Sequence, residues 1–189
     1  MDRPLRRSGD VNEAIAERVP TVAGETTAEA FTALYERTFP KVYAYVASLL
    51  RDVSAAEDVT AQTFERAYRR RRSYRRSRGT PEAWIFGIAR NAALDELRRR
   101  RRRSRLEAEP EDVAAPSADD QVELALRRQT VRAALATLED RERDMVALKF
   151  VGGLSNAEIA RVLGLSESNV GTRLHRTITK LREACHERA

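Results

Sequence analysis

The chain has 189 residues, of which 42% are hydrophobic and 34% are charged. It can therefore bury a hydrophobic core, but not the core of a single large globular domain. Its net charge of +6 suits a polyanionic partner, and most of its basic residues are arginine, whose planar fork fits phosphates and base edges. The single cysteine, Cys185, excludes an internal disulfide and fits a reducing cytoplasm. We expect an intracellular protein without a membrane span, and the lack of alternating β-branched residues predicts an all-α fold of two small domains.

The chain begins with a polar stretch and then turns helical. Residues 1–27 carry no strong apolar period, and we predict a disordered N-terminal extension there. A helical stripe follows, which we expect to be interrupted so that Pro40 lies in the first turn of a second helical piece. Ser54 and Glu57 have the spacing of a capping box, which predicts the start of the next helix.

A strongly basic segment comes next. Residues 66–105 contain sixteen arginines against three acidic residues, and repulsion within such a patch favours nucleic acid as the partner that offsets it. The loop 69–80 holds one aromatic residue, Tyr74, which would suit stacking on an unpaired base. Thr80 followed by Pro81 is typical of a helix start, with the threonine as the N-cap.

The charge then reverses. Residues 107–123 contain seven acidic residues and no basic one, with two prolines and no apolar period. We therefore predict a flexible acidic linker over 104–121, between a first helical domain at 28–103 and a second at 122–185. At about 3.3–3.6 Å per residue, the extended linker would reach roughly 60 Å.

Two helices are predicted at the start of the second domain. We expect one to be lined by Leu124, Val131, Leu135 and Leu138, and the next by Met145, Val146, Leu148 and Phe150. Gly152 and Gly153 would then end the second of these helices.

A helix-turn-helix is predicted from Leu154 to Glu183. Ser155 and Glu158 form a capping box, Gly164 is the left-handed residue that ends the first helix, and Ser166 caps the second. Its buried face is expected to consist of Val170, Leu174, Ile178 and Leu181. Its outward face is expected to consist of Thr172, Arg173, His175, Arg176 and Thr179. Such a basic second helix is typical of major-groove DNA binding, although two capped helices around a glycine turn also occur in plain bundles.

Two motifs, the first in two segments, together resemble a bacterial RNA polymerase sigma factor of the sigma-70 family, extracytoplasmic-function group. The segments AEDVTAQTFERAY (56–68) and PEAWIFGIARNAALDELRRRRR (81–102) are similar to sigma region 2. The segment LEDRERDMVALKFVGGLSNAEIARVLGLSESNVGTRLHRTITKLRE (138–183) is similar to region 4. The resemblance implies a factor that binds core RNA polymerase, reads the −35 and −10 elements and opens the −10 duplex.

The resemblance also implies three sets of site residues. The clamp set, which would dock on the β′ clamp helices, consists of Glu57, Asp58, Ala61, Gln62 and Glu65. The −10 set consists of Tyr74, Arg75, Arg76, Arg78, Asn91, Asp95, Arg98 and Arg99. The −35 set consists of Ser168, Asn169, Thr172, Arg173, His175 and Arg176. The family usually has glutamate at the position of Gln62 and often has a basic residue at that of Gly171.

The implied partners are core RNA polymerase, through its β′ and β subunits, promoter DNA and an anti-sigma factor. We expect no catalytic residue, metal or other cofactor, because Cys185 and His186 are adjacent near the C-terminus, where they suit neither a metal site nor a nucleophile–base pair. The alternative is a helix-turn-helix regulator that binds duplex DNA without being a polymerase subunit. Such regulators carry a receiver or sensor domain built on a parallel sheet, and the first half of this chain has no strand pattern.

Overall fold

The computed structural model describes residues 27–107 and 122–186, with side chains at 30–103 and 129–186. Within these residues there are helices and no strands, which confirms the all-α prediction. The predicted N-terminal extension lies outside the described residues except for Thr27, as do the linker from 108 to 121 and the side chain of Leu124. No described helix has an apolar stretch long enough to cross a membrane.

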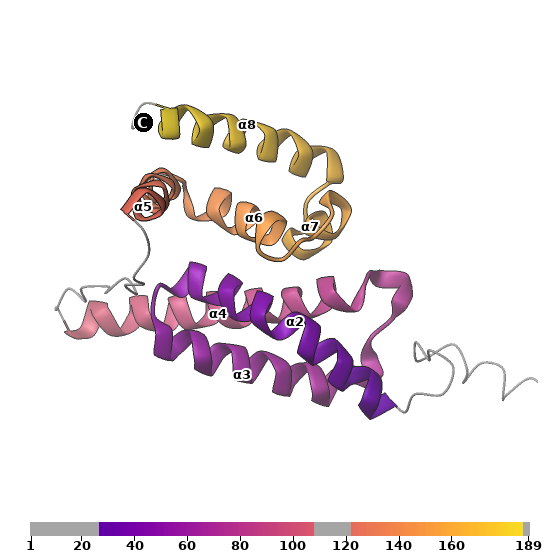
Figure 1. Cartoon of the computed structure of the whole chain (residues 1–189). Coiled ribbons are helices and arrows are strands. Elements are labelled where there is room, and N and C mark those ends of the chain that lie inside the picture. The colour runs from indigo at the N-terminus through magenta and orange to yellow at the C-terminus, as the bar shows by residue number, and fades with distance from the viewer. Residues whose placement is uncertain (1–26, 108–121, 187–189) are drawn as a thin grey trace, which may run out of the picture.

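Three long helices form the N-terminal bundle: α2 (Thr27–Leu50), α3 (Val53–Arg70) and α4 (Pro81–Glu107). Figure 1 shows them side by side, with all three pairs in contact. Helix α4 continues four residues past the predicted domain boundary at 103. Two short 3-10 turns, η1 (Arg71–Ser73) and η2 (Arg76–Arg78), occupy the basic loop that connects α3 to α4.

Helix α2 is continuous, so the prediction that a second helical piece begins near Pro40 was wrong. Pro40 lies inside the helix and is exposed, so water can donate to the backbone carbonyl that its missing N–H leaves without a donor. The helix ends before Arg51, a non-glycine residue in the left-handed conformation (φ 54°). The chain therefore turns into α3 without a glycine.

The predicted capping box at the start of α3 was also wrong. Asp52 is the N-cap, and its side chain accepts a hydrogen bond from the backbone N–H of Ala55 at 2.9 Å. Ser54, the predicted cap, is exposed inside the first turn. Aspartate and serine are about equally good caps, so local sequence did not distinguish the two positions.

Four helices form the C-terminal unit: α5 (Val122–Ala136), α6 (Asp140–Phe150), α7 (Asn156–Leu163) and α8 (Glu167–His186). Of the apolar side chains predicted to line α5 and α6, Val131 is 50% exposed and Phe150 is 65% exposed. Both line a wide groove between this unit and the turn from α2 into α3.

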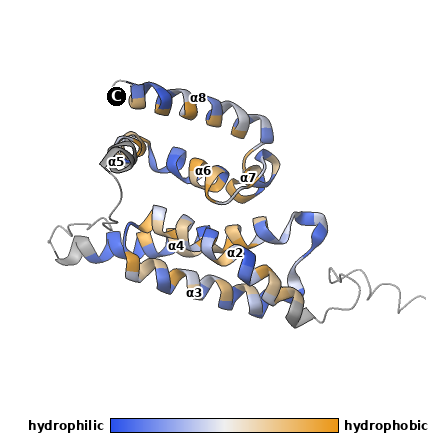
Figure 2. Cartoon of the chain, in the orientation of Figure 1, coloured by the Kyte–Doolittle hydropathy of each residue, from blue (hydrophilic) through white to orange (hydrophobic). Residues whose placement is uncertain are grey.

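The two units share one hydrophobic core. Buried Tyr45 and Phe86 of the bundle belong to the same cluster as Leu148 and Ile159 of the C-terminal unit. Helix α7 packs on α4 and α6 packs on α2, as the stacked layers of Figure 1 show. Hydrophobic segments of both units face this boundary in Figure 2. The chain is therefore closed on itself in this structure.

Candidate nucleic-acid and polymerase interfaces

The basic loop is held in shape by Tyr74. Its hydroxyl donates to the carbonyl of Gly79 at 2.8 Å, and its ring lies 5.5 Å from that of Trp84. Tyr74 is only 9% exposed, so in this conformation it anchors the loop and does not present its ring to a base. Burial raises the pKa of the Tyr74 phenol above its usual range. Stacking on DNA would require this loop to open.

Helix α4 carries the rest of the −10 set on a rigid scaffold. Thr80 accepts from the N–H of Ala83 at 3.3 Å and so caps the helix, with Pro81 in its first position as predicted. Asn91, Asp95, Arg98 and Arg99 are exposed, as are Arg75, Arg76 and Arg78 of the loop. Exposed guanidinium and amide groups can contact phosphates and base edges without first being uncovered by refolding.

The clamp set lies on the outer face of α3. Glu57, Asp58, Ala61 and Glu65 are exposed, and Gln62 is half-buried. Glu65 pairs with Arg69 one turn later at 2.7 Å, a solvent-exposed pair that contributes little to stability. The remaining carboxylates of this face are open to a basic partner.

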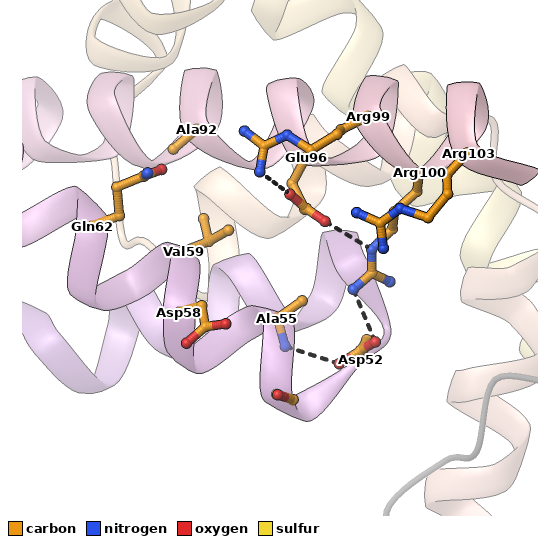
Figure 3. Close-up of a pocket in the computed structure, with 11 residues that line it drawn as sticks. Asp52, Ala55, Asp58, Val59, Gln62, Ala92, Glu96, Arg99, Arg100 and Arg103 are labelled. Atoms are coloured by element: carbon orange, nitrogen blue, oxygen red, sulfur yellow. Dashed lines mark hydrogen bonds and ion pairs between the residues drawn. The ribbon is translucent and has the colours of Figure 1, made fainter.

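A polar groove of about 360 Å³ brings two of the predicted sets together. Asp58 and Gln62 of the clamp set line it with Arg99 of the −10 set. Figure 3 shows the ion pairs that fix its end: Arg100 contacts Asp52 at 2.8 Å and Glu96 at 3.2 Å. The Ala55 N–H and, secondarily, Arg100 hold the pKa of Asp52 below its usual value.

The helix-turn-helix has the predicted caps. Ser155 and Glu158 form the reciprocal capping box, and Gly164 is left-handed at φ 67°. The N–H of Asn169 donates to the hydroxyl of Ser166 at 3.2 Å. The sequence pattern alone was sufficient to predict these caps, because each capping residue and its hydrogen-bond partner lie within four residues of each other.

The −35 set lies on the outer face of α8. Ser168, Thr172, Arg173, His175 and Arg176 are exposed, and Asn169 is half-buried. The side chain of Asn169 accepts from Arg173 Nε at 2.6 Å, which holds that guanidinium before any DNA arrives. On the opposite face, Val170 and Leu174 are buried as predicted, and Ile178 and Leu181 are half-buried.

Sequence reasoning missed the residues that join the two units. Asp144 of α6 is 5% exposed and accepts two hydrogen bonds, from the Tyr45 hydroxyl and from Arg90 Nε, both at 2.7 Å. Glu158 of α7 accepts from the hydroxyl of Thr80. One feature of the sequence could have indicated this contact: the charged Asp144 stands directly before the apolar run of α6.

The described residues contain no cluster of three or more His, Cys, Asp or Glu side chains placed to hold a metal ion. The half-buried Cys185 and exposed His186 are on the last turn of α8.

Comparison with known proteins matches both halves of the chain to one family. The signature of Sigma-70 region 2 covers residues 34–103, and that of Sigma-70 region 4 covers 128–181. The chain is 30% identical over 186 residues to the ECF RNA polymerase sigma factor SigK of Mycobacterium ulcerans, covering 96% of this chain and 97% of that protein. It is 32% identical over 169 residues to SigL of Mycobacterium tuberculosis, covering 88% and 96%.

The fold is also similar to a solved sigma factor. The RpoE chain of Bartonella quintana, crystallised with the anti-sigma factor NepR, superposes with a TM-score of 0.68 at 25% identity, covering 82% of this chain and 96% of that chain. The N-terminal bundle thus corresponds to region 2 and the C-terminal unit to region 4. A helix-turn-helix regulator independent of polymerase is not favoured, because region 2 accounts for the first half of the chain. The chain belongs to the extracytoplasmic-function group of the sigma-70 family of RNA polymerase sigma factors.

Proposed function

We propose that the three predicted sets of residues divide the work of initiation. The clamp set binds core polymerase, the −10 set reads and holds the unpaired −10 strand, and the −35 set reads duplex DNA in the major groove. The domains would be those expected from the sequence: 28–103 for docking and −10 recognition, 104–121 as the linker, and 122–185 for −35 recognition.

The observation that carries this proposal is the segregation of surface chemistry. The outer face of α3 has open carboxylates, whereas α4 and its preceding loop have exposed arginines and an exposed Asn91. Acidic groups suit a basic protein surface and arginines suit phosphates and guanine edges, so each face fits a different partner. The exposed half of α8 adds a second DNA-contacting surface on a capped, rigid helix.

The test is transcription by purified bacterial core RNA polymerase on a pool of promoter fragments, with and without this protein. We expect initiation from a subset that shares −35 and −10 elements, only when the protein is present. Asn91→Ala combined with Arg98→Ala should lower initiation at least about tenfold, because each lost base contact costs about 1–3 kcal/mol. Retained binding to core would place the loss in DNA recognition.

The matched control is Arg102→Ala, which removes a charge from the same exposed stretch of α4 outside the −10 set. It should change initiation much less than the double variant. Equal losses would mean that total charge and not the −10 set determines recognition. Tight binding to duplex DNA without any association with core polymerase would instead favour an independent regulator.

Catalysis would remain with the polymerase, and the chain would act in the cytoplasm, where the polymerase and the promoters are. An anti-sigma factor is a further proposed partner, because the similar RpoE of Bartonella quintana was crystallised with one. Purification of the chain from its native cells would test both partners, by showing whether core polymerase and an anti-sigma factor purify with it.

A further inference from the structure

We propose that Asn169 reads no base itself and instead positions Arg173, so that the two side chains form one guanine-reading unit near the start of α8. The inference rests on the proposed −35 set, to which both residues belong, and it divides that set by role. Three observations carry it: the hydrogen bond between the two side chains, the orientation that this bond imposes on both, and the contrast with Arg176.

The unit is built on the capped first turn of α8. The hydroxyl of Ser166 accepts the backbone N–H of Asn169 at 3.2 Å, which fixes the backbone from which the amide side chain extends. Asn169 is half-buried, and its Oδ1 accepts a hydrogen bond from Arg173 Nε one turn later at 2.6 Å. Hydrogen bonds from a charged donor are shorter and stronger than neutral ones, so this contact restrains a long side chain that is otherwise exposed.

The hydrogen bond also fixes how each group can be used. A guanidinium has five donors and no acceptor, so the amide must turn its oxygen, and not its nitrogen, toward Arg173. The bond occupies Nε and leaves the Nη1 and Nη2 donors of Arg173, which together match the O6 and N7 acceptors of guanine. Arg173 is therefore prepared for a bidentate contact with guanine through the end of its side chain.

The same bond argues against base reading by Asn169. Asparagine reads adenine bidentately, because its Oδ1 accepts from the N6 amino group while its Nδ2 donates to N7. The Oδ1 of Asn169 is already bonded to Arg173, so reading adenine would compete with holding the arginine. The remaining Nδ2 donor does not select a base by itself, because N7 is an acceptor on both purines.

Arg176 supplies the internal comparison. It is exposed on α8 about one turn beyond Arg173, and it makes no hydrogen bond or ion pair with another described residue. Ordering one rotamer-rich side chain on binding lowers affinity about 2- to 10-fold. For Arg173 part of this ordering is complete in the free chain. Loss of Asn169 should therefore weaken the contact of Arg173 by a similar factor and leave that of Arg176 unchanged.

The test uses holoenzyme, that is, purified core polymerase with the full chain, on promoter fragments that carry the −35 element recovered by transcription. Each base pair of the element is exchanged in turn, G·C for A·T and the reverse, and base selectivity is the ratio of affinities measured by competition between labelled fragments. Arg173→Ala should lower this ratio about 5- to 150-fold at one guanine. Asn169→Ala should lower it about 2- to 10-fold at the same guanine.

A double-mutant cycle separates positioning from direct reading. If Asn169 acts only through Arg173, Asn169→Ala should change selectivity by less than about twofold in the Arg173→Ala background. The matched control is the cycle with Arg176→Ala, because Arg176 shares no partner with Asn169, and there the two effects should multiply. An equal effect of Asn169→Ala with and without Arg173, or a loss of selectivity at an adenine, would overturn the proposal.

The conservative variant Asn169→Asp adds a readout that a purely structural role would not move. Its carboxylate keeps the acceptor for Arg173 Nε but lacks the amide donor, and its charge repels the phosphates of every fragment alike. We expect lower affinity for all fragments together with retained guanine selectivity. Selectivity as low as that of Asn169→Ala would contradict the positioning role.

Nuclear magnetic resonance of the free chain tests the hydrogen bond without DNA. The Nε–Hε proton of Arg173 should exchange with water more slowly than that of Arg176 in the wild type and in Asn169→Asp, and this protection should be lost in Asn169→Ala. Equal exchange of the two arginines in the wild type would overturn the proposal.

The outcomes also separate this inference from the proposed function. If Arg173→Ala leaves selectivity unchanged, Arg173 leaves the −35 set and the guanine-reading unit is refuted with it. If Arg173→Ala lowers selectivity and Asn169→Ala adds an independent loss, the −35 set stands and the positioning role alone is wrong.

Discussion

Among the glycines that the structure describes, Gly152 has the least room for a side chain. A Cβ there would lie 2.7 Å from the carbonyl oxygen of Leu148 and 3.2 Å from two ring atoms of Phe86. The carbonyl of Leu148 is held in place, because it accepts the N–H of Leu154 at 3.2 Å. Phe86 is fully buried and comes from the other unit, so it has no free side toward which to move.

We therefore predict that Gly152→Ala destabilises the chain. Overpacking of this kind costs about 1–3 kcal/mol. In a chain of this size each kcal/mol lowers the midpoint of thermal unfolding by about 2–4 °C, so the expected loss is roughly 2–12 °C. Thermal unfolding followed by circular dichroism at 222 nm would measure it.

The matched control is Gly87→Ala in α4. A Cβ at Gly87 would have no neighbour within 4 Å, and glycine inside a helix is less stable than alanine by about 0.5–1 kcal/mol. This variant should raise the midpoint, whereas Gly152→Ala should lower it. A midpoint of Gly152→Ala at or above that of the wild type would refute the argument that Phe86 and Leu148 leave no space.

Four other substitutions or conditions give further tests. Gly171→Ala should stabilise α8 by about 1 kcal/mol, measured by thermal unfolding, because a Cβ there meets only an ordinary contact at 3.7 Å. Asp52→Ala should lower the unfolding free energy by about 0.5–2 kcal/mol in urea, and Ser54→Ala, which removes no cap, should change it little. The pKa values of Asp52 and Glu158 are lowered in the folded state, so their stabilisation is present above pH of about 4 and is lost as the pH falls through the folded-state values. Urea midpoints between pH 6 and pH 3 should therefore fall less in Glu158→Gln than in the wild type. Arg176→Ala should weaken initiation at −35-dependent promoters by about 1–3 kcal/mol while core binding persists, and an unchanged promoter preference would remove Arg176 from the −35 set.

The origin of the Glu158 shift links acid sensitivity to the closed form. Burial raises its pKa, but hydrogen bonds from the Thr80 hydroxyl and from the backbone and side chain of Ser155 outweigh that effect. One of these donors belongs to the other unit. Part of the stability lost in acid should thus be interdomain.

Local sequence determined the features whose partners are a few residues away. The Thr80–Pro81 start of α4, the Ser155–Glu158 box and the left-handed Gly164 are all in the structure as predicted. Each depends on backbone groups within one helical turn, so the spacing of residue types is sufficient to predict it. The outward face of α8 follows from the 3.6-residue period in the same way.

Tertiary structure decided what local sequence could not. Pro40 is tolerated inside α2 because, on the solvent side of a packed helix, water can replace the one backbone hydrogen bond that proline does not make. Phe150 fits the apolar period of α6, yet its exposure depends on what the neighbouring helices cover. Asp144 lies 99 residues from Tyr45 and 54 from Arg90, and no periodic pattern predicts pairing at such separations. The helices and their caps are local properties of this sequence, whereas the closure of region 4 onto region 2 depends on long-range contacts that only the folded chain brings together.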